Sequence, residues 1–271
     1  MQNEINAAKL VVIKVGSSLL IRDGALDTQW LAGLTEEIKT ASTRGQQIMV
    51  VTSGAVALGC ASAGLDRQAL TLEQSQAAAA IGQIALTQGW QDCLAGKGLK
   101  AAQILLTIGD TEERRRYLNA RRTLQALLDM GTVPIINEND TVATQELRYG
   151  DNDRLAARVA GMMSADVLIL LSDVDGFYTA APETDKNADL IREVTDVNDE
   201  LLAMAGGAGS AVGSGGMVTK LQAAQIAMQA GCHMILTDGR GAHPLSRLHE
   251  TGRATLFRAM QNPLAARKNW I

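Results

Sequence analysis

The sequence predicts an α/β fold, a three-layer αβα sandwich in which a central, mostly parallel sheet is covered by helices on both faces. Short, continuously apolar stretches rich in β-branched residues alternate with helical segments along the 271 residues. Apolar residues make up 46% of the chain and aromatic residues only 3%, so we expect a sizeable core of Ala, Leu, Val and Ile. These two observations together favour a parallel sheet, because its strands are buried on both faces.

Four strands are predicted in the first half of the chain, each of them short, apolar and β-branched. They cover residues 9–15, 47–54, 101–107 and 133–137, and the second opens into a glycine turn.

Helices are predicted between these strands. Asp27 can cap a helix that Gly45 stops, and Thr71 and Gln74 have capping-box spacing ahead of a long Ala-rich helix. Residues 111–131 are expected to form one helix that has its acids first and its glycine last, as the helix dipole prefers.

The second half of the chain continues the same alternation. Buried strands are predicted at residues 166–173 and 233–238, and residues 175–194 interrupt the rhythm like a hairpin. Because no clear linker or repeat occurs, we expect a single domain over residues 1–271. It would have an N-terminal acceptor lobe (about 1–165) and a C-terminal nucleotide lobe (about 166–271).

Composition excludes several classes of function. The formal net charge of −4 does not suggest a surface for nucleic acid. Cys60, Cys93 and Cys232 are far apart and odd in number, which disfavours both a disulfide framework and a zinc site. The N-terminus lacks a secretory apolar region, and no apolar run approaches the ~20 residues that span a bilayer. A cytoplasmic protein that does not contact membranes is therefore expected.

The polar residues of interest follow the strands. In parallel sheets, ligands bind at the carboxyl ends of the strands. Four such ends carry small, polar or acidic residues: "KVGSS", "TSGA", "NEND" and "SDVDG". Surface loops without a function would rarely agree so well, so a ligand site is predicted at this edge.

A glycine-rich turn and two lysines suggest that the ligand carries phosphate. Residues 213–220, "GSGGMVTK", precede a helix, whose free N–H groups and positive dipole end suit an anion. The turn lacks the residue order of a Walker loop and of the dinucleotide fingerprint. Lys14 lies in a strand that should be buried, where an ammonium needs an anionic partner. It could instead extend to the solvent at the strand end.

These features fit phosphoryl transfer, which needs little covalent help from the protein. Lys14 and Lys220 could supply positive charge, and Asp173 could orient both ammonium groups. Mg²⁺ would be carried mainly by the nucleotide phosphates. Close backbone approach would come from glycines that follow strands or open a helix: Gly16, Gly54, Gly215 and Gly216.

The stretch 136–153, "INENDTVATQELRYGDND", holds five carboxylates in eighteen positions. A metal site, a solvated loop with Asp153 as a helix cap, and a grip on a cationic substrate are all compatible with it. The metal site is disfavoured because the acids lack EF-hand order and no histidine cluster accompanies them.

Several of these segments, taken in order along the chain, resemble the amino-acid kinase family. They are "VVIKVGSSLL", "VTSGA", "LNARRTLQALLDMGTVPIINENDTVA", "GDNDRLAA", "LLSDVDGFYTA" and "GSGGMVTKLQAA". The pair INEND and GDND resembles the members that act on glutamate. The resemblance implies ATP-dependent phosphorylation of the γ-carboxylate of L-glutamate to L-glutamyl 5-phosphate, the first step of proline synthesis.

The resemblance also implies roles for matching residues. Lys14 would contact the nucleotide phosphates, and Ser53, with Gly54, the glutamate. Asp140 would accept from the α-ammonium with help from Asp151 or Asp153, and Asn152 would donate to the α-carboxylate. The ATP contacts would be Ser172 and Asp173, followed by the second ATP segment, in which Ser214 replaces the usual Thr: Ser214, Gly215, Gly216, Met217, Val218, Thr219 and Lys220.

Further properties are expected from the resemblance alone. They are a homo-oligomer (dimer or tetramer), feedback inhibition by proline, and hand-off of the product to a reductase, glutamate-5-semialdehyde dehydrogenase. Many members continue into a PUA domain, which we expect to be absent here. Two rivals stay open: another carboxylate, carbamate or nucleotide kinase of this fold, and a non-catalytic nucleotide- or amino-acid-binding regulator. Retention of both Lys14 and Lys220 argues against the regulator.

Overall fold

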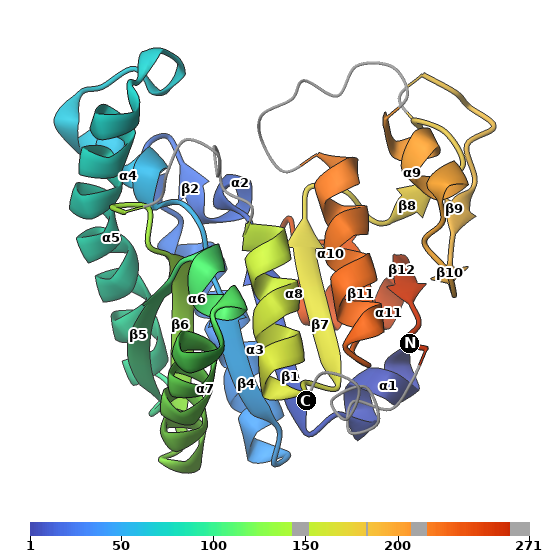
Figure 1. Cartoon of the computed structure of the whole chain (residues 1–271), viewed down its shortest axis with the longest axis horizontal. Coiled ribbons are helices and arrows are strands. Elements are labelled where there is room, and N and C mark those ends of the chain that lie inside the picture. Colours follow the sequence, from blue (N-terminus) through green and yellow to red (C-terminus); the bar gives the residue numbers. More distant parts are fainter. Residues whose placement is uncertain (143–151, 183, 207–215, 261–271) are drawn as a thin grey trace.

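The computed structural model describes residues 1–142, 152–182, 184–206 and 216–260. Its centre is an eight-stranded sheet in which neighbouring strands are parallel, except for the antiparallel pair β11–β12 (Figure 1). In spatial order the strands are β10 (Glu193–Val194), β12 (Ala254–Phe257), β11 (His233–Asp238), β7 (Val167–Ser172), β1 (Leu10–Val15), β4 (Gln47–Val51), β6 (Thr132–Glu138) and β5 (Lys100–Leu106).

Helices cover both faces of the sheet, because alternate residues of each strand point to opposite sides. In β1, Val12 packs in one core cluster with residues of α7, α8 and α10, and Val11 and Ile13 pack in the other with residues of α3, α5 and α11. The three-layer α/β fold predicted from the sequence is confirmed. The helices named here are α3 (Thr28–Thr43), α5 (Leu72–Ala95), α7 (Arg114–Asp129), α8 (Asn152–Met163), α10 (Met217–Gln229) and α11 (Pro244–Thr251).

Two segments outside the main sheet were predicted from the sequence, one correctly and one not. The hairpin expected within 175–194 is confirmed, since β8 (Phe177–Tyr178) pairs with β9 (Leu190–Ile191) in antiparallel fashion. The single helix expected at 111–131 is wrong. The chain forms α6 (Ile108–Glu112) and then α7, with Glu113 as the N-cap of α7, so the acids precede α7 and its first turn carries arginines.

The remaining elements have at most nine residues each. They are α1 (Gln2–Ala7), α2 (Ser17–Leu20), β2 (Ile21–Arg22), β3 (Ala25–Leu26), α4 (Ala55–Ala63), the 3₁₀ turn η1 (Arg67–Ala69) and α9 (Asp199–Gly206). In the described part of the chain, no helix is long and apolar enough to cross a membrane.

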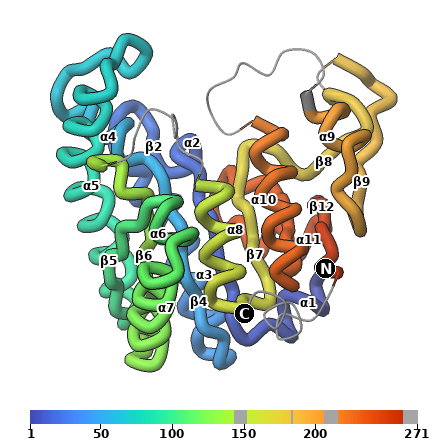
Figure 2. The backbone as a smooth tube through the Cα atoms, viewed as in Figure 1, coloured from blue at the N-terminus to red at the C-terminus, as the bar shows by residue number. Residues whose placement is uncertain are grey.

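Helices α4 and α5 approach each other unusually closely, and Figure 2 shows them side by side at the edge of the molecule that carries β5. A β-carbon at Gly59 would lie 1.7 Å from the backbone oxygen of Ala78, and one at Gly82 would lie 1.9 Å from that of Ala55. Only glycine fits at these two positions. The contact fixes α5 against the turn that links β4 to α4.

Candidate active site

The carboxyl ends of five neighbouring parallel strands form one continuous edge. Across it, the order is β11, β7, β1, β4 and β6. Strand β1 lies between one neighbour, β4, that follows it directly among the sheet strands and another, β7, that comes late in the chain. Such a switch point is where open α/β sheets bind ligands. We call the β4–β6 part of this edge the acceptor side and the β7–β11 part the nucleotide side.

Lys14 stands at the centre of this edge. Because side chains alternate along β1, Lys14 follows Leu10 and Val12 onto the face that α8 and α10 cover. The residue is 7% exposed, and its ammonium forms an ion pair with Asp153, which is 1% exposed. The sequence therefore places a lysine in a buried strand and supplies its anionic partner from the first turn of α8.

Asp153 is shared with a second lysine. Nζ of Lys220, from α10, lies 3.1 Å from Oδ2 of Asp153, and Lys220 is 6% exposed. Burial alone would raise the pKa of Asp153, but the two ammonium groups outweigh burial and hold the pKa of this carboxyl below its usual range. Two buried cations share one carboxylate, so the triad carries a net charge of +1. Two ammonium groups this close together attract an anionic ligand.

The position between the two lysines was expected for Asp173, and that expectation is wrong. Asp173 is exposed at the end of β7 and accepts a hydrogen bond from Oγ of Ser172 at 3.0 Å. Both lysines instead form ion pairs with Asp153, which was expected to bind a substrate ammonium or to cap α8. Asp153 lies on the face covered by α10, which the sequence pattern of one short acidic stretch could not reveal.

Ser53 and Asn152 meet on the acceptor side. Nδ2 of Asn152 donates to Oγ of Ser53 at 2.8 Å and to the backbone oxygen of Thr52 at 2.7 Å. The turn that presents Ser53 depends on Gly54, whose φ of 111° is a left-handed conformation that favours glycine. Asn152 and Asp153 are adjacent, so the start of α8 joins Ser53 to the lysine triad.

The amide of Asn152 is already committed to the protein. Its nitrogen carries two hydrogens and has three acceptors, the third being Oδ1 of Asn137 at 3.0 Å. In this arrangement Asn152 has no hydrogen left for an α-carboxylate, contrary to the role expected for it. Its own Oδ1 is buried and accepts no hydrogen bond within the described ranges.

Asp140 lies in the turn that follows β6, also on the acceptor side. Burial raises the pKa of this carboxyl to about 6. A partly desolvated carboxylate is stabilised by a cation that binds beside it. Asp151, the third acid expected at this site, lies outside the described residues.

The nucleotide side holds the residues expected to bind ATP, as far as the structure describes them. Ser172 is buried at the end of β7, and Gly216 is the N-cap of α10. Met217 and Val218 pack against the core, whereas Thr219 donates from Oγ1 to the backbone oxygen of Gly216 at 2.7 Å. Ser214 and Gly215 lie outside the described residues.

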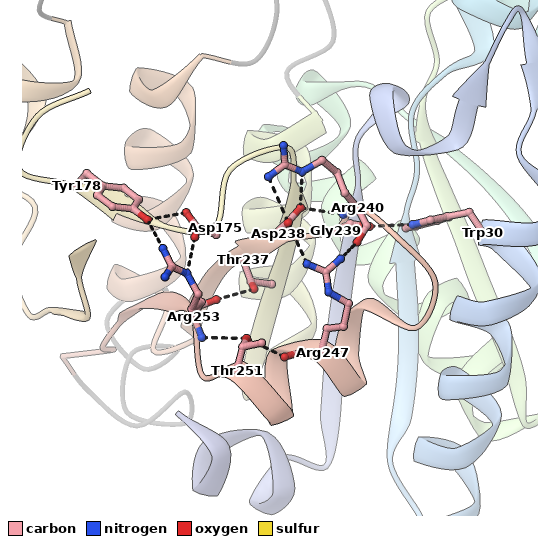
Figure 3. Close-up of polar contacts among 10 residues, drawn as sticks. All are labelled: Trp30, Asp175, Tyr178, Thr237, Asp238, Gly239, Arg240, Arg247, Thr251 and Arg253. Carbon is pink, nitrogen blue, oxygen red and sulfur yellow. Dashed lines mark hydrogen bonds and ion pairs between the residues drawn. The ribbon is translucent and has the colours of Figure 1, made fainter. Parts of the chain in front are cut away.

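The far end of the nucleotide side carries arginines (Figure 3). Asp238, the last residue of β11, accepts from Nε of Arg240 at 2.9 Å and from Nη2 of Arg247 at 3.2 Å. Asp175 pairs in the same way with Arg253 at 2.7 Å. Trp30 of α3 donates from Nε1 to the backbone oxygen of Gly239 at 2.8 Å, which fixes this loop to the rest of the molecule.

Sequence reasoning missed four polar residues that support the acceptor side. Nε1 of Trp90 in α5 donates to Oγ1 of Thr52 at 3.0 Å. Nδ2 of Asn137 donates to Oε1 of Gln83, also in α5, at 2.7 Å. Asn137 belongs to the acidic stretch and could have been considered. Thr52 lies in the quoted TSGA turn, although no role was expected for it, and no periodicity or motif singled out Gln83 or Trp90.

The described residues contain no group of three or more His, Cys, Asp or Glu side chains that could hold a metal ion.

Comparisons with known proteins agree with this geometry. Residues 9–238 match the amino acid kinase family. Glutamate 5-kinase of Rhodopseudomonas palustris (strain BisB5) is 56% identical over 263 residues, which cover 96% of this chain and 70% of that protein. Glutamate 5-kinase of Paramagnetospirillum magneticum (strain ATCC 700264 / AMB-1) is 55% identical over 267 residues, covering 98% of this chain and 72% of that protein.

A solved structure is similar in fold. The crystal structure of UMP kinase from Ureaplasma parvum superposes with a TM-score of 0.61 at 15% identity, covering 92% of this chain and 97% of that chain. At this identity the likeness speaks for the arrangement of helices and strands and not for the substrate.

Proposed function

The chain belongs to the amino acid kinase family, and we propose that it is a glutamate 5-kinase, which phosphorylates the γ-carboxylate of L-glutamate with ATP. The observation that carries this proposal is the buried triad of Lys14, Asp153 and Lys220 at the switch point of the sheet. Its net positive charge lies between the acceptor side and the nucleotide side. A phosphoryl group in transfer would lie between the same two sides.

In the reaction, an oxygen of the γ-carboxylate attacks the γ-phosphorus and the bond from that phosphorus to the β,γ-bridging oxygen breaks. The products are the acyl phosphate and ADP. No base is needed, because a carboxylate is already ionised at neutral pH. The ammonium groups of Lys14 and Lys220 would bind the phosphoryl oxygens, and Asp153 holds these two groups together at one point.

The acceptor side supplies uncharged and acidic groups suited to glutamate. Ser53 can donate its hydroxyl hydrogen to a carboxylate of the substrate. Asp140 would accept from the α-ammonium, which would lower the pKa that burial raises to about 6. We assign the acceptor lobe to residues before about 165 and the nucleotide lobe to those after it.

The nucleotide would bind along β7 and the start of α10, through Ser172, Asp173 and the segment 214–220. Mg²⁺ fits as an ion carried on the ATP phosphates, where it would neutralise charge that develops on the leaving group. The exposed carboxylate of Asp173 is placed at the same edge and could meet it.

Several finer properties belong to this proposal. Proline shares the ammonium and α-carboxylate of glutamate and would compete for the acceptor side. Ile81 and Ile84 of α5 are 44% and 75% exposed, which supports a homo-oligomer that covers them. The labile product would pass to a reductase, glutamate-5-semialdehyde dehydrogenase, in the cytoplasm.

The test is an assay of purified protein with ATP, Mg²⁺ and L-glutamate, in which hydroxylamine traps the acyl phosphate as a hydroxamate. We expect ADP and hydroxamate in equal amounts, both dependent on glutamate. Preference for another carboxylate, a carbamate or UMP would favour a different kinase of this fold. Tight nucleotide binding without any transfer would favour a non-catalytic regulator.

A further inference from the structure

A chain of uncharged hydrogen bonds runs from α5 to Ser53. Nε2 of Gln83 donates to Oγ1 of Thr87 at 3.1 Å, and Oε1 of Gln83 accepts from Nδ2 of Asn137 at 2.7 Å. Oδ1 of Asn137 and Oγ of Ser53 lie 3.0 and 2.8 Å from Nδ2 of Asn152, whose two hydrogens are shared among these two oxygens and the backbone oxygen of Thr52. Asn137 and Asn152 are 2% and 3% exposed, so water competes little for these bonds.

The direction of every bond in the chain is fixed at one point. Nδ2 of Asn152 lies 2.7 Å from the backbone oxygen of Thr52, and a backbone carbonyl can only accept. The amide nitrogen of Asn152 must therefore face this carbonyl. Asn137 must then turn its oxygen to Asn152 and its nitrogen to Gln83. An acceptor at position 83 is thus needed to complete the amide of Asn137.

Helix α5 is placed to supply that acceptor. The missing side chains of Gly59 and Gly82 let α4 and α5 touch through their backbones, directly beside Gln83. A second side chain of α5, the fully buried Trp90, holds Oγ1 of Thr52 at 3.0 Å. Side chains of α5 therefore help to position both Thr52, directly, and Ser53, through Asn137 and Asn152.

The consequence falls on the hydroxyl of Ser53. Because Oγ of Ser53 accepts from Asn152, its single hydrogen is left to donate elsewhere. Ser53 is half-buried at the carboxyl edge, where a ligand can reach it.

We propose that Gln83 is a positioning residue, which acts through Asn137 and Asn152 to hold the Ser53 hydroxyl as a hydrogen-bond donor to a carboxylate of the acceptor substrate. The inference rests on the proposed function for the identity of that substrate. Gln83 itself need not touch glutamate, and the sequence motifs of the site do not include it.

Gln83→Met tests the proposal, since methionine fills a similar volume, keeps helix propensity and cannot accept from Asn137. We expect the KM for glutamate to rise roughly threefold to tenfold, the loss of about one neutral hydrogen bond, with kcat and the KM for ATP unchanged. Gln88→Met is the matched control, because Gln88 bonds only to Asp92 on the exposed face of the same helix among the described residues. Gln83→Glu retains an acceptor for Asn137 and should restore most of the affinity.

A double-mutant cycle with Ser53→Ala separates positioning from general damage. If Gln83 acts through Ser53, Gln83→Met should change the KM for glutamate little once Ser53 is alanine. Equal effects of Gln83→Met in both backgrounds, a KM that does not move, or Gln83→Glu as poor as Gln83→Met would each overturn the inference. Wild-type protein without glutamate-dependent turnover would count against the proposed function instead.

Discussion

The two sides of the carboxyl edge are held in opposite ways. On the acceptor side, buried and uncharged amides of Asn137 and Asn152 fix the geometry. At the far end of the nucleotide side, the exposed guanidinium of Arg240 and the partly exposed one of Arg247 share the carboxylate of Asp238 (Figure 3).

The difference follows from what each side would bind. Glutamate carries charges of both signs within a small molecule. Charged supporting side chains beside it would therefore compete with the residues that bind glutamate. Neutral amides orient Ser53 without adding a net charge. The loop that contains Arg240 follows β11 and is exposed, and exposed ion pairs add little stabilisation and little interference there.

Asp153 forms ion pairs with both buried lysines, so its substitution should have the largest effect on stability and on kcat. Asp153→Asn leaves the ammonium groups of Lys14 and Lys220 facing each other in a buried site. We expect the free energy of unfolding to fall by about 3 kcal/mol or more, as when a buried pair loses one partner. We also expect kcat to fall on the order of 10²-fold, because the phosphoryl cradle loses its geometry.

Asp173→Asn is the matched control in urea unfolding, since Asp173 is exposed at the neighbouring strand end. Its free energy of unfolding should stay within roughly 0.5 kcal/mol of wild type. Equal losses of unfolding free energy in the two variants would contradict the role of Asp153 as the buried partner of both lysines.

Gly82→Ala should give the next largest effect, and it acts on the acceptor side alone. The added methyl would lie 1.9 Å from the backbone oxygen of Ala55, so α4 and α5 must separate. Overpacking of this kind lowers the free energy of unfolding by roughly 1–3 kcal/mol. Because α5 carries Gln83 and Trp90, the KM for glutamate should rise while the KM for ATP stays near that of wild type.

Gly96→Ala at the end of the same helix serves as the control. Gly96 has φ −60°, and a β-carbon there would meet nothing nearer than 3.4 Å. Its thermal unfolding and kinetics should match wild type. A change in the KM for ATP as large as that for glutamate in Gly82→Ala would contradict the separation of the two sides.

Asp140 gives a pH-dependent test of the acceptor side. Its pKa of about 6 means that the carboxylate needed for an ammonium is lost as the pH falls through that value. The KM for glutamate should rise about tenfold between pH 7 and pH 5, and Asp140→Asn should abolish most of this dependence. A wild-type KM that is flat over this range would exclude Asp140 as the ammonium acceptor.

The same raised pKa has a consequence for stability. A carboxyl whose pKa is higher in the folded protein than its ordinary value of 3.8 stabilises the fold when protonated, and this contribution is lost as the pH rises through about 6. Without ligand, Asp140→Asn should therefore be more stable than wild type above pH 6, by roughly 1–3 kcal/mol in urea unfolding. A high, fixed concentration of glutamate should narrow the difference, because the wild type binds glutamate more tightly and is stabilised more by it.

The sequence was sufficient for the layers of the fold and for the edge that carries the site. Continuous apolar strands predict a parallel sheet, and the polar residues that follow them predict its carboxyl edge. Lys14 could be singled out because a lysine in a buried strand needs a partner. Which carboxylate partners it could not be predicted: Asp153 and Asp173 both follow from local pattern, and only the packing of α8 against α10 and β1 decides between them.

Residues such as Gln83 could not be found from the sequence for a different reason. Its partner Asn137 lies 54 positions away, and the bond depends on two glycines that let helices touch. A half-buried glutamine on an Ala-rich helix carries no local signal. The split of 111–131 into α6 and α7 escaped prediction because Thr107 and Asp110 form a capping box that starts α6 directly after β5, ahead of residue 111.

Arg240→Ala should have the smallest effect and should show why the nucleotide side can be built from charges. The side chain of Arg240 is 63% exposed, and Asp238 keeps its second partner, Arg247. Hydrogen bonds from both arginines hold the pKa of Asp238 below its usual range even though burial raises it. An exposed pair of this kind contributes about 0.2–1 kcal/mol at low salt. At 1 M salt the Debye length shrinks to about 3 Å, and most of this contribution should vanish. Urea unfolding measures this contribution, because urea leaves the ionic strength unchanged.

The effect of Gln83→Met on the KM for glutamate, by contrast, should be the same at both salt concentrations, since no charge takes part in its hydrogen bonds. If Arg240→Ala loses as much stability at 1 M salt as at low salt, the arginine loop acts through packing rather than charge, and the two sides of the edge are held by the same kind of force.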